Sequence, residues 1–337
     1  MKRLIDIVKR LNKARVLVIG DIILDEYLWG GVERISPEAP VPVVWANKLT
    51  HAPGGASNVA YNISSYGACA SLCGVIGKDK NASVLLKVLR KEGIDTKGVF
   101  VLPDRCTTVK TRVVAGNQQV VRVDWEHREP LSKGLILKLF NFVKKNIKGV
   151  DAIIIEDYGK GVVNAQLLKM LIRLARQHKK IILVDPKEDN FQYYQKVTSI
   201  TPNRKELENA VRSLKIKDAK NRLKLNSDKF FTDEDIDKAG RKILEYLRLD
   251  SLLVTLGENG IRLFEKRGKV THIPTVAQQV FDVSGAGDTV IATFALSLAV
   301  GASREEAARI ANYAAGIVVG KLGTAVATKK ELIERLS

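Results

Sequence analysis

The sequence predicts an α/β protein with one doubly wound, mostly parallel sheet flanked by helices and a small projecting β lid. Three observations support this fold class. Short runs rich in Val, Ile and Leu alternate along the chain with amphipathic segments of helical length. Several of these runs end in Gly or Asp, as expected where parallel strands meet their loops. Residues 30–45 contain three prolines and fit neither pattern, which places them outside the main sheet.

The first half of the chain supplies strands, helices and both parts of the predicted lid. Residues 107–124 alternate between apolar and polar side chains around a turn at Gly116-Asn117, which predicts a half-exposed β-hairpin. We assign this hairpin and residues 30–45 to the lid. The other predicted strands are 15–19, 71–76 and 99–102, and the predicted helices end at 65 or span 82–91 and 135–145.

The second half continues the strand–helix alternation, so we expect residues 1–337 to form a single domain. A stretch rich in Lys and Asn, residues 213–232, interrupts the pattern and is interpreted as a surface insertion. Predicted strands are 151–155, 180–184, 252–255 and the pair 261–264 with 270–273; predicted helices are 165–178, a segment after 203, 290–300 and 307–319.

Composition narrows the class of protein. No apolar run reaches about 18 residues, so no membrane span is expected. The charged, amphipathic first twelve residues lack the apolar core of a signal peptide. Three cysteines and four scattered histidines suggest neither a disulfide framework nor a zinc site, which fits a reducing cytoplasm.

The net charge of +18 is compatible with nucleic-acid binding or with a phosphorylated substrate. Because the basic residues are spread along the whole chain without a nucleic-acid-binding motif, a nucleic-acid partner is disfavoured.

One short stretch carries the main functional hypothesis. Asp282-Val-Ser-Gly-Ala-Gly-Asp288 immediately precedes the apolar helix at 290–300. Gly285, Ala286 and Gly287 at a helix start can present backbone amides to an anion. Asp288 in the same turn can take a proton from a hydroxyl that attacks a phosphoryl group. The alternative is a tight turn followed by an ordinary helix-dipole partner.

Two other nucleotide motifs are excluded. Residues 316–322 approach a P-loop, but only three residues separate the glycines and Leu322 replaces the magnesium-binding Ser or Thr. No G-x-G-x-x-G follows the first strand, so a dinucleotide-dependent oxidoreductase is unsupported.

Two motifs together resemble the signatures of the ribokinase-like (PfkB) carbohydrate kinases. They are Gly54-Gly55 followed by Asn58, with Gly67 downstream, and the segment 282–288. Their order and spacing match across nearly the whole chain. Residues 34–43 further resemble the lid of D-glycero-β-D-manno-heptose 7-phosphate kinases, as do the segments 117–119, 157–161, 185–187, 203–206 and 320–324. The nucleotide-binding His motif of the adenylyltransferase domain often fused to that enzyme is absent, so a stand-alone kinase is expected.

The resemblance implies roles for particular residues. Asp288 is expected to be the base and residues 285–287 the anion hole. Asn203 and Glu206 are expected to hold Mg²⁺ through water, although the same pair can form a helix capping box. Thr255 and Gly257 close a strand at the carboxyl edge of the sheet and are expected to contact ATP, together with Arg204 and Lys205. The residues that suit sugar hydroxyls are Asp21, Asp25, Gly54, Gly55 and Asn58. A substrate that already carries a phosphate needs cations that ATP does not occupy, and the candidates are Arg34, Arg112, Lys160 and Lys187. Asp21 can instead cap a turn, and any of these cations can be a solvated surface group.

Several alternatives stay open at this stage. The substrate can be ribose, fructose or a nucleoside instead of the heptose phosphate, and a non-catalytic sugar- or nucleic-acid-binding protein is a further class. Apolar residues on the lid, such as Val41 and Trp45, suggest a homodimer formed through it. A monovalent cation near the anion hole is also left open.

Overall fold

The computed structural model describes the chain except for residues 117, 218–222, 224, 226–227, 231, 278–279 and 322. The central feature is a nine-stranded sheet with the order β13-β12-β11-β10-β9-β8-β1-β4-β5. Neighbours from β11 to β5 pair in parallel, whereas β12 and β13 are antiparallel. This confirms the predicted fold class. The strands are β1 (Arg15–Gly20), β4 (Cys69–Gly77), β5 (Asp95–Leu102), β8 (Ala152–Glu156), β9 (Ile181–Asp185), β10 (Ser199–Ile200), β11 (Ser251–Thr255), β12 (Ile261–Glu265) and β13 (Val270–Ile273).

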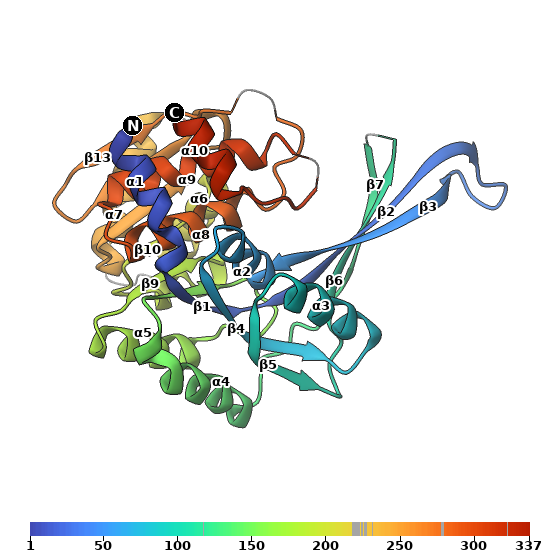
Figure 1. Cartoon of the computed structure of the whole chain (residues 1–337), viewed down its shortest axis with the longest axis horizontal. Coiled ribbons are helices and arrows are strands. Elements are labelled where there is room, and N and C mark those ends of the chain that lie inside the picture. The colour runs from blue at the N-terminus through green and yellow to red at the C-terminus, as the bar shows by residue number, and fades with distance from the viewer. Residues whose placement is uncertain are drawn as a thin grey trace.

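Helices cover both faces of this sheet (Figure 1). Side chains alternate across a strand, so Val16 and Val18 of β1 enter one hydrophobic cluster while Leu17 and Ile19 enter the other. The first cluster packs α1 (Lys2–Arg10), α2 (Ala56–Ser65), α3 (Lys80–Lys91), α8 (Ala286–Ala299), α9 (Arg304–Val318) and α10 (Lys329–Leu336). The second packs α4 (Lys133–Asn146), α5 (Ala165–Gln177), α6 (Arg204–Lys217) and α7 (Asp233–Leu247).

A second sheet, the arm, projects from this body (Figure 1). Its order is β3-β2-β6-β7, formed by β2 (Ile22–Ile35), β3 (Pro42–Gly55), β6 (Thr108–Ala115) and β7 (Gln118–Trp125). Burial falls along β2 from its start to its exposed end. Pro42 and Pro53 lie on β3, an edge strand, where a missing N–H is tolerated. The arm strands thus begin at Ile22, earlier than the sequence pattern indicated.

The region around the predicted insertion differs from expectation. Helix α6 extends to Lys217, and α7, absent from the sequence-based prediction, begins at a capping box formed by Thr232 and Asp235. Between them, Leu223, Leu225 and Phe230 are buried in the second cluster. At these positions the stretch is therefore part of the core, and the rest of it lies largely outside the described residues.

The two ends of the chain lie together. Helices α1 and α10 pack against each other (Figure 1). Lys329 Nζ donates to the Lys9 carbonyl at 2.6 Å. Across the described residues, no helix has both the length and the apolar character needed to cross a membrane.

Candidate active site

The candidate site lies where the carboxyl ends of the parallel strands meet the start of α8. Parallel strands end at one edge of a sheet, which brings together residues distant in sequence. Asp21 follows β1, Glu156 and Asp185 end β8 and β9, and Thr255 ends β11. Helix α8 lies behind this edge with residues 288–297 all buried, so its first turn is held firmly against the strand ends.

Asp288, in that first turn, is buried to 3% exposure. Its Oδ2 accepts a hydrogen bond from Asn58 Nδ2 at 2.6 Å, and its Oδ1 accepts one from the Tyr158 hydroxyl at 3.2 Å. Burial raises the pKa of Asp288 to about 6, against the opposing effect of these two hydrogen bonds. A carboxylate with a pKa close to neutrality suits proton abstraction better than an exposed one does.

The glycines before Asp288 shape the helix entrance. Gly285 has φ 78°, and a Cβ there would lie 2.7 Å from Asn58 Nδ2. A Cβ on Gly287 would meet only Asp185 Oδ2, at 4.0 Å, so the space in front of it is open. Among the described residues, the amides of Gly285 and Gly287 have no hydrogen-bond acceptor, whereas the Ala286 amide donates to the Val283 carbonyl at 3.2 Å. The predicted anion hole thus has two available amides, and the third closes the turn.

Helix α2 packs against the start of α8 and holds Asp288 in position through hydrogen bonds. Gly55, with φ 52°, precedes it, and a Cβ on Gly54 would lie 2.7 Å from Asp25 Oδ2. One turn beyond Asn58, Asn62 donates to the Asn58 carbonyl and accepts a hydrogen bond from the Thr289 hydroxyl at 2.8 Å. Gly54 therefore allows β3 to approach Asp25 closely, Gly55 allows it to approach the Asp21 carbonyl, and the two asparagines link α2 to α8.

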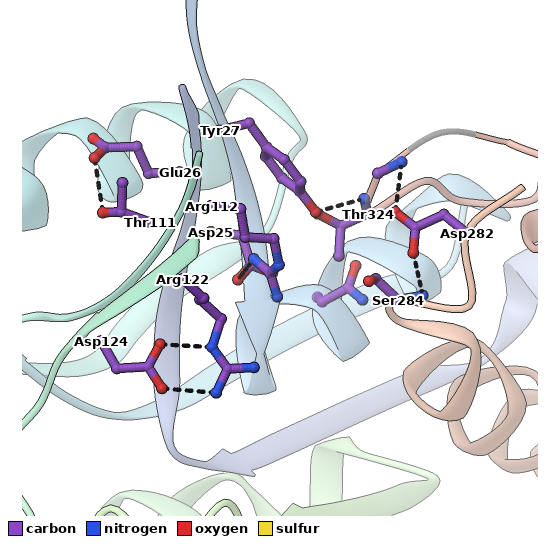
Figure 2. Close-up of polar contacts among 12 residues, drawn as sticks. Asp25, Glu26, Tyr27, Thr111, Arg112, Arg122, Asp124, Asp282, Ser284 and Thr324 are labelled. Carbon is purple, nitrogen blue, oxygen red and sulfur yellow. Dashed lines mark hydrogen bonds and ion pairs between the residues drawn. The ribbon is translucent and has the colours of Figure 1, made fainter. Parts of the chain in front are cut away.

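The base of the arm supplies cations (Figure 2). Arg112 donates to Asp25 Oδ1 at 2.6 Å, and its guanidinium lies 5.2 Å from the centre of the Tyr27 ring. Opposite it in register, Arg122 makes a two-pronged pair with Asp124 at 2.8 and 3.0 Å. Lys110 Nζ lies 4.4 Å from the centre of the Tyr158 ring, and burial lowers the pKa of Lys110.

Tyr27 and Asp282 link the arm to the loop before α8. The Tyr27 hydroxyl accepts a hydrogen bond from the Thr324 amide at 3.2 Å, while the Asp282 carboxylate accepts from the amides of Ser284 and Gly323 (Figure 2). The entrance to α8 is therefore connected to the base of the arm.

Asp21 has a different environment from Asp288. Its Oδ2 accepts from the amides of Tyr158 and Lys160 at 2.9 and 3.0 Å, and its Oδ1 from the amide of Val162 at 3.2 Å. These bonds hold the loop that positions the Tyr158 hydroxyl, so both Asp21 oxygens are engaged by the protein itself.

A cluster of three carboxylates offers ligands for a divalent cation. Oxygens of Glu156, Asp185 and Asp288 lie within 4.8 Å of one another. Glu156 is fully buried, and neither of its carboxylate oxygens has a hydrogen-bond partner. Burial, together with the neighbouring carboxylates, raises the pKa values of Glu156 and Asp185 well above their usual range. The Glu156 oxygens and the neighbouring carboxylates are hard oxygen donors of the kind that bind Mg²⁺, and a bound cation would take the place of their protons.

The predicted nucleotide residues gather beside this cluster. Asn203 and Thr255 form a parallel β-bridge, and Gly257, with φ 60°, follows Thr255 in the next turn. Asn203 and Glu206 do form a capping box: the Asn203 amide donates to Glu206 Oε2 at 2.8 Å, and the Glu206 amide to Asn203 Oδ1 at 2.9 Å. The other two predicted ATP contacts follow Asn203 in α6. Arg204 forms an ion pair with Glu208 at 3.6 Å, and Lys205 is exposed.

Three of the predicted substrate cations have surroundings other than those at Asp288: two are ion-paired and one lies far along the arm. Lys160 Nζ pairs with Glu126, and Lys187 Nζ pairs with Glu188 at 3.3 Å. Arg34 is exposed, nine positions along β2 from Asp25, which is about 30 Å for an extended strand. The prolines near Arg34 indicated a projecting segment but not its length.

Sequence reasoning assigned no role to four residues that the structure puts at the site. Glu156 and Asp185 each end an apolar strand, a signal that could have marked them as edge carboxylates. Lys110 and Tyr158 carried no such signal, because their contacts depend on how the arm folds back over the 156–162 loop.

Sites of this kind transfer phosphoryl groups to hydroxyls, so the fold and the site together define the class as a small-molecule kinase. The chain belongs to the pfkB family of carbohydrate kinases, because the model of that family matches residues 13–331.

Curated relatives and solved structures agree with this assignment. A Helicobacter pylori (strain J99) protein called Bifunctional protein HldE is 45% identical over 318 residues, which cover 94% of this chain and 65% of the relative. The Trichlorobacter lovleyi protein of the same name is 43% identical over 329 residues, covering 98% of this chain and 64% of the relative. The chain thus spans slightly less than two thirds of the length of these relatives.

Among solved structures, an Arabidopsis thaliana ribokinase complexed with ribose and ATP matches with a TM-score of 0.73 and 18% identity, covering 96% of this chain and 99% of that one. Phosphofructokinase-2 from Escherichia coli, in complex with substrates and products, matches with a TM-score of 0.73 and 18% identity, covering 95% and 97%. At these identities the similarity concerns the fold.

Proposed function

We propose that the protein transfers the γ-phosphoryl group of ATP to O1 of D-glycero-β-D-manno-heptose 7-phosphate. The product is the 1,7-bisphosphate, used for ADP-heptose and lipopolysaccharide core synthesis. The observation that carries the phosphoryl-transfer chemistry is Asp288, with a pKa of about 6, next to the free amides of Gly285 and Gly287. The choice of sugar is supported by the resemblances of residues 34–43 and 157–161 and by the relatives at 43–45% identity.

Each residue in the proposed mechanism has one task. Asp288 takes the proton from the O1 hydroxyl, and O1 attacks the γ-phosphorus as the bond to the ADP oxygen breaks. The amides of Gly285 and Gly287 stabilise the negative charge on the transferring group. Asn58 and Tyr158 orient the Asp288 carboxylate. Mg²⁺ held by Glu156 and Asp185, with Glu206 beside them, would neutralise phosphate charge.

The cations at the base of the arm are the proposed site for the 7-phosphate. Lys110, Arg112 and Arg122 occupy one face of the arm near Asp25, and guanidinium groups bind phosphate well. Of the described contacts, none is an ion pair of Lys110 with a carboxylate, which leaves its charge available to the substrate. Asp25 and Gly54 at the same end of the arm are proposed to contact the sugar hydroxyls.

An ADP-release assay separates this proposal from its rivals. The expected result is turnover with heptose 7-phosphate and much weaker turnover with unphosphorylated heptose, ribose, fructose and nucleosides. Lys110→Met should raise KM for the sugar phosphate about 10- to 100-fold while leaving KM for ATP within twofold. Lys97→Met, an exposed change on β5, serves as the control. Equal turnover with an unphosphorylated sugar would overturn the substrate assignment.

Two further assays address the non-catalytic alternative and the monovalent cation. No turnover with any sugar, combined with salt-dependent DNA binding, would favour a nucleic-acid-binding protein on this scaffold. Comparing rates in potassium and sodium chloride tests a monovalent cation beside the anion hole.

We also propose that two copies pair through the arm. Trp45, Ile35 and Val41 are 71%, 63% and 51% exposed, which is unusual for large apolar side chains on a projecting sheet. Sedimentation should give a dimer for the wild type and a monomer for Ile35→Lys/Trp45→Lys. A monomeric wild type at micromolar concentration would contradict this pairing.

A further inference from the structure

A basic groove lies apart from the kinase site, between α5 and the 3₁₀ segment Glu188–Tyr193 with the turn that follows it. Its volume is about 630 Å³. Lys169, Arg173 and Arg176 recur at helical spacing on the exposed face of α5, and Lys196 faces them from the turn. Tyr193 is 41% exposed on the same wall. The helical spacing therefore gathers four cations and one aromatic ring around a single hollow.

In the part of the chain that the structure describes, these four charges have no carboxylate partners. None of Lys169, Arg173, Arg176 and Lys196 makes an ion pair with any residue in the described part of the chain, and no Asp or Glu lines the groove. Within the described residues, the Arg176 guanidinium donates to the Lys196 carbonyl at 3.3 Å. Elsewhere on the surface, comparable arginines are paired, as Arg309 is with Glu305. Like charges at helical spacing repel one another, so an anion bound between them would be favoured.

Hydrogen bonds connect one wall of the groove to the loop that carries Asp157 and Tyr158. Asn190 Nδ2 and the Tyr194 hydroxyl, on either side of Tyr193, both donate to Asp157 Oδ2, at 2.7 and 2.6 Å. Asp157 lies between Glu156 and Tyr158, and the Tyr158 hydroxyl donates to Asp288. A ligand that moves the Glu188–Tyr193 segment would therefore act on the hydrogen bonds that orient the base.

We propose that this groove is a second binding site for a small, multiply phosphorylated anion. Arg173, Arg176, Lys169 and Lys196 bind its phosphates, and Tyr193 stacks on a base when the anion is a nucleotide. The concave shape and the volume match small-molecule pockets, whereas a nucleic acid needs an extended basic track. Occupancy changes the kinase rate through Asp157 and Tyr158; this regulatory part rests on the proposed function, and the binding site does not.

Lysine footprinting tests the site without relying on activity. The protein is acetylated with and without inorganic tripolyphosphate, and each lysine is quantified by mass spectrometry. The expected result is at least threefold slower acetylation of Lys169 and Lys196, with exposed Lys144 and Lys145 on α4 unchanged. Arg173→Glu/Arg176→Glu should abolish this protection, while the matched reversal Lys144→Glu/Lys145→Glu should retain it.

Two comparisons identify the anion. Protection by ADP at lower concentration than tripolyphosphate, lost in Tyr193→Ala, supports a nucleotide as the ligand; equal protection supports the phosphate chain alone. Absent or uniform protection across all lysines overturns the site. Stronger protection by duplex DNA than by either small anion overturns the ligand class.

The kinase rate tests the coupling separately. At saturating substrates, tripolyphosphate should change kcat at least twofold in the wild type and in the Lys144→Glu/Lys145→Glu control, and not in Arg173→Glu/Arg176→Glu. Footprint protection without this change in kcat would overturn the regulatory part. An inactive enzyme that still shows protection would contradict only the proposed function.

Discussion

Asp21 and Asp288 lie at the same edge of the sheet, are equally buried, and differ in what surrounds them. Asp21 accepts hydrogen bonds from three backbone amides, whereas Asp288 accepts one from the Asn58 side-chain amide and one from the Tyr158 hydroxyl. Burial raises the pKa of both, and that of Asp288 reaches about 6. A buried carboxylate that accepts several amide hydrogen bonds can hold a loop in place, while one with fewer donors keeps lone pairs that can accept a proton. Residue type and burial alone therefore do not separate a structural carboxylate from a reactive one.

The largest expected effect comes from Asp288→Asn. Removing the proposed base should lower kcat about 10²- to 10⁴-fold, measured by ADP release. Stability should rise: the folded pKa lies above the unfolded value, so above pH 6 the ionised, buried group costs up to about 3 kcal/mol that Asn does not. A thermal shift at pH 7.5 checks this. Near-normal kcat would refute the role of Asp288, and a lower Tm would contradict the account of its environment.

The pH profile should show the same group in the wild type. Because Asp288 acts ionised, kcat/KM should fall about tenfold per pH unit below about 6. Unfolding must be followed by circular dichroism over the same range. An activity that stays flat down to pH 5 in the folded enzyme would mean that the pKa of the base lies lower than its burial indicates.

A smaller effect, on stability, is expected for Asp21→Asn. The amide nitrogen of Asn would face backbone N–H groups, so the free energy of unfolding should fall by about 2 kcal/mol. Urea denaturation measures the loss, with exposed Asp6→Asn as control. KM for the sugar should change less than kcat if Asp21 acts by holding the loop that carries Tyr158. A higher KM for the sugar with an unchanged free energy of unfolding would indicate instead that Asp21 binds the sugar.

The smallest effect is expected for Arg34→Ala, which should change kcat and KM less than twofold. Its position on the exposed half of β2 keeps it away from Asp288 of the same chain. Steady-state kinetics with the heptose phosphate is the measurement. A tenfold loss would mean that a second copy brings Arg34 to the site through the arm.

Much of the architecture was predictable because apolar runs and their terminal Gly and Asp residues encode strands locally. Helix α7 was missed because its charged start, Asp233 to Asp235, follows the Lys-rich stretch and looked like part of it. The sequence could place Asp288 beside its glycines at a helix start because one short segment contains them. It could not place Tyr158, Lys110 and Glu156 near them, because those positions depend on contacts between segments far apart in sequence. Arg34 shows the converse. Its position in a proline-rich segment indicated a lid, but it did not indicate how far the side chain lies from Asp288.

The packing of α1 against α10 has a practical consequence for engineering. Because the two ends emerge side by side on the body and away from the arm (Figure 1), an affinity handle or a fused domain at either end leaves the strand edge and the arm accessible. A short linker joining the ends, with new termini opened elsewhere, should give a circular permutant that still folds.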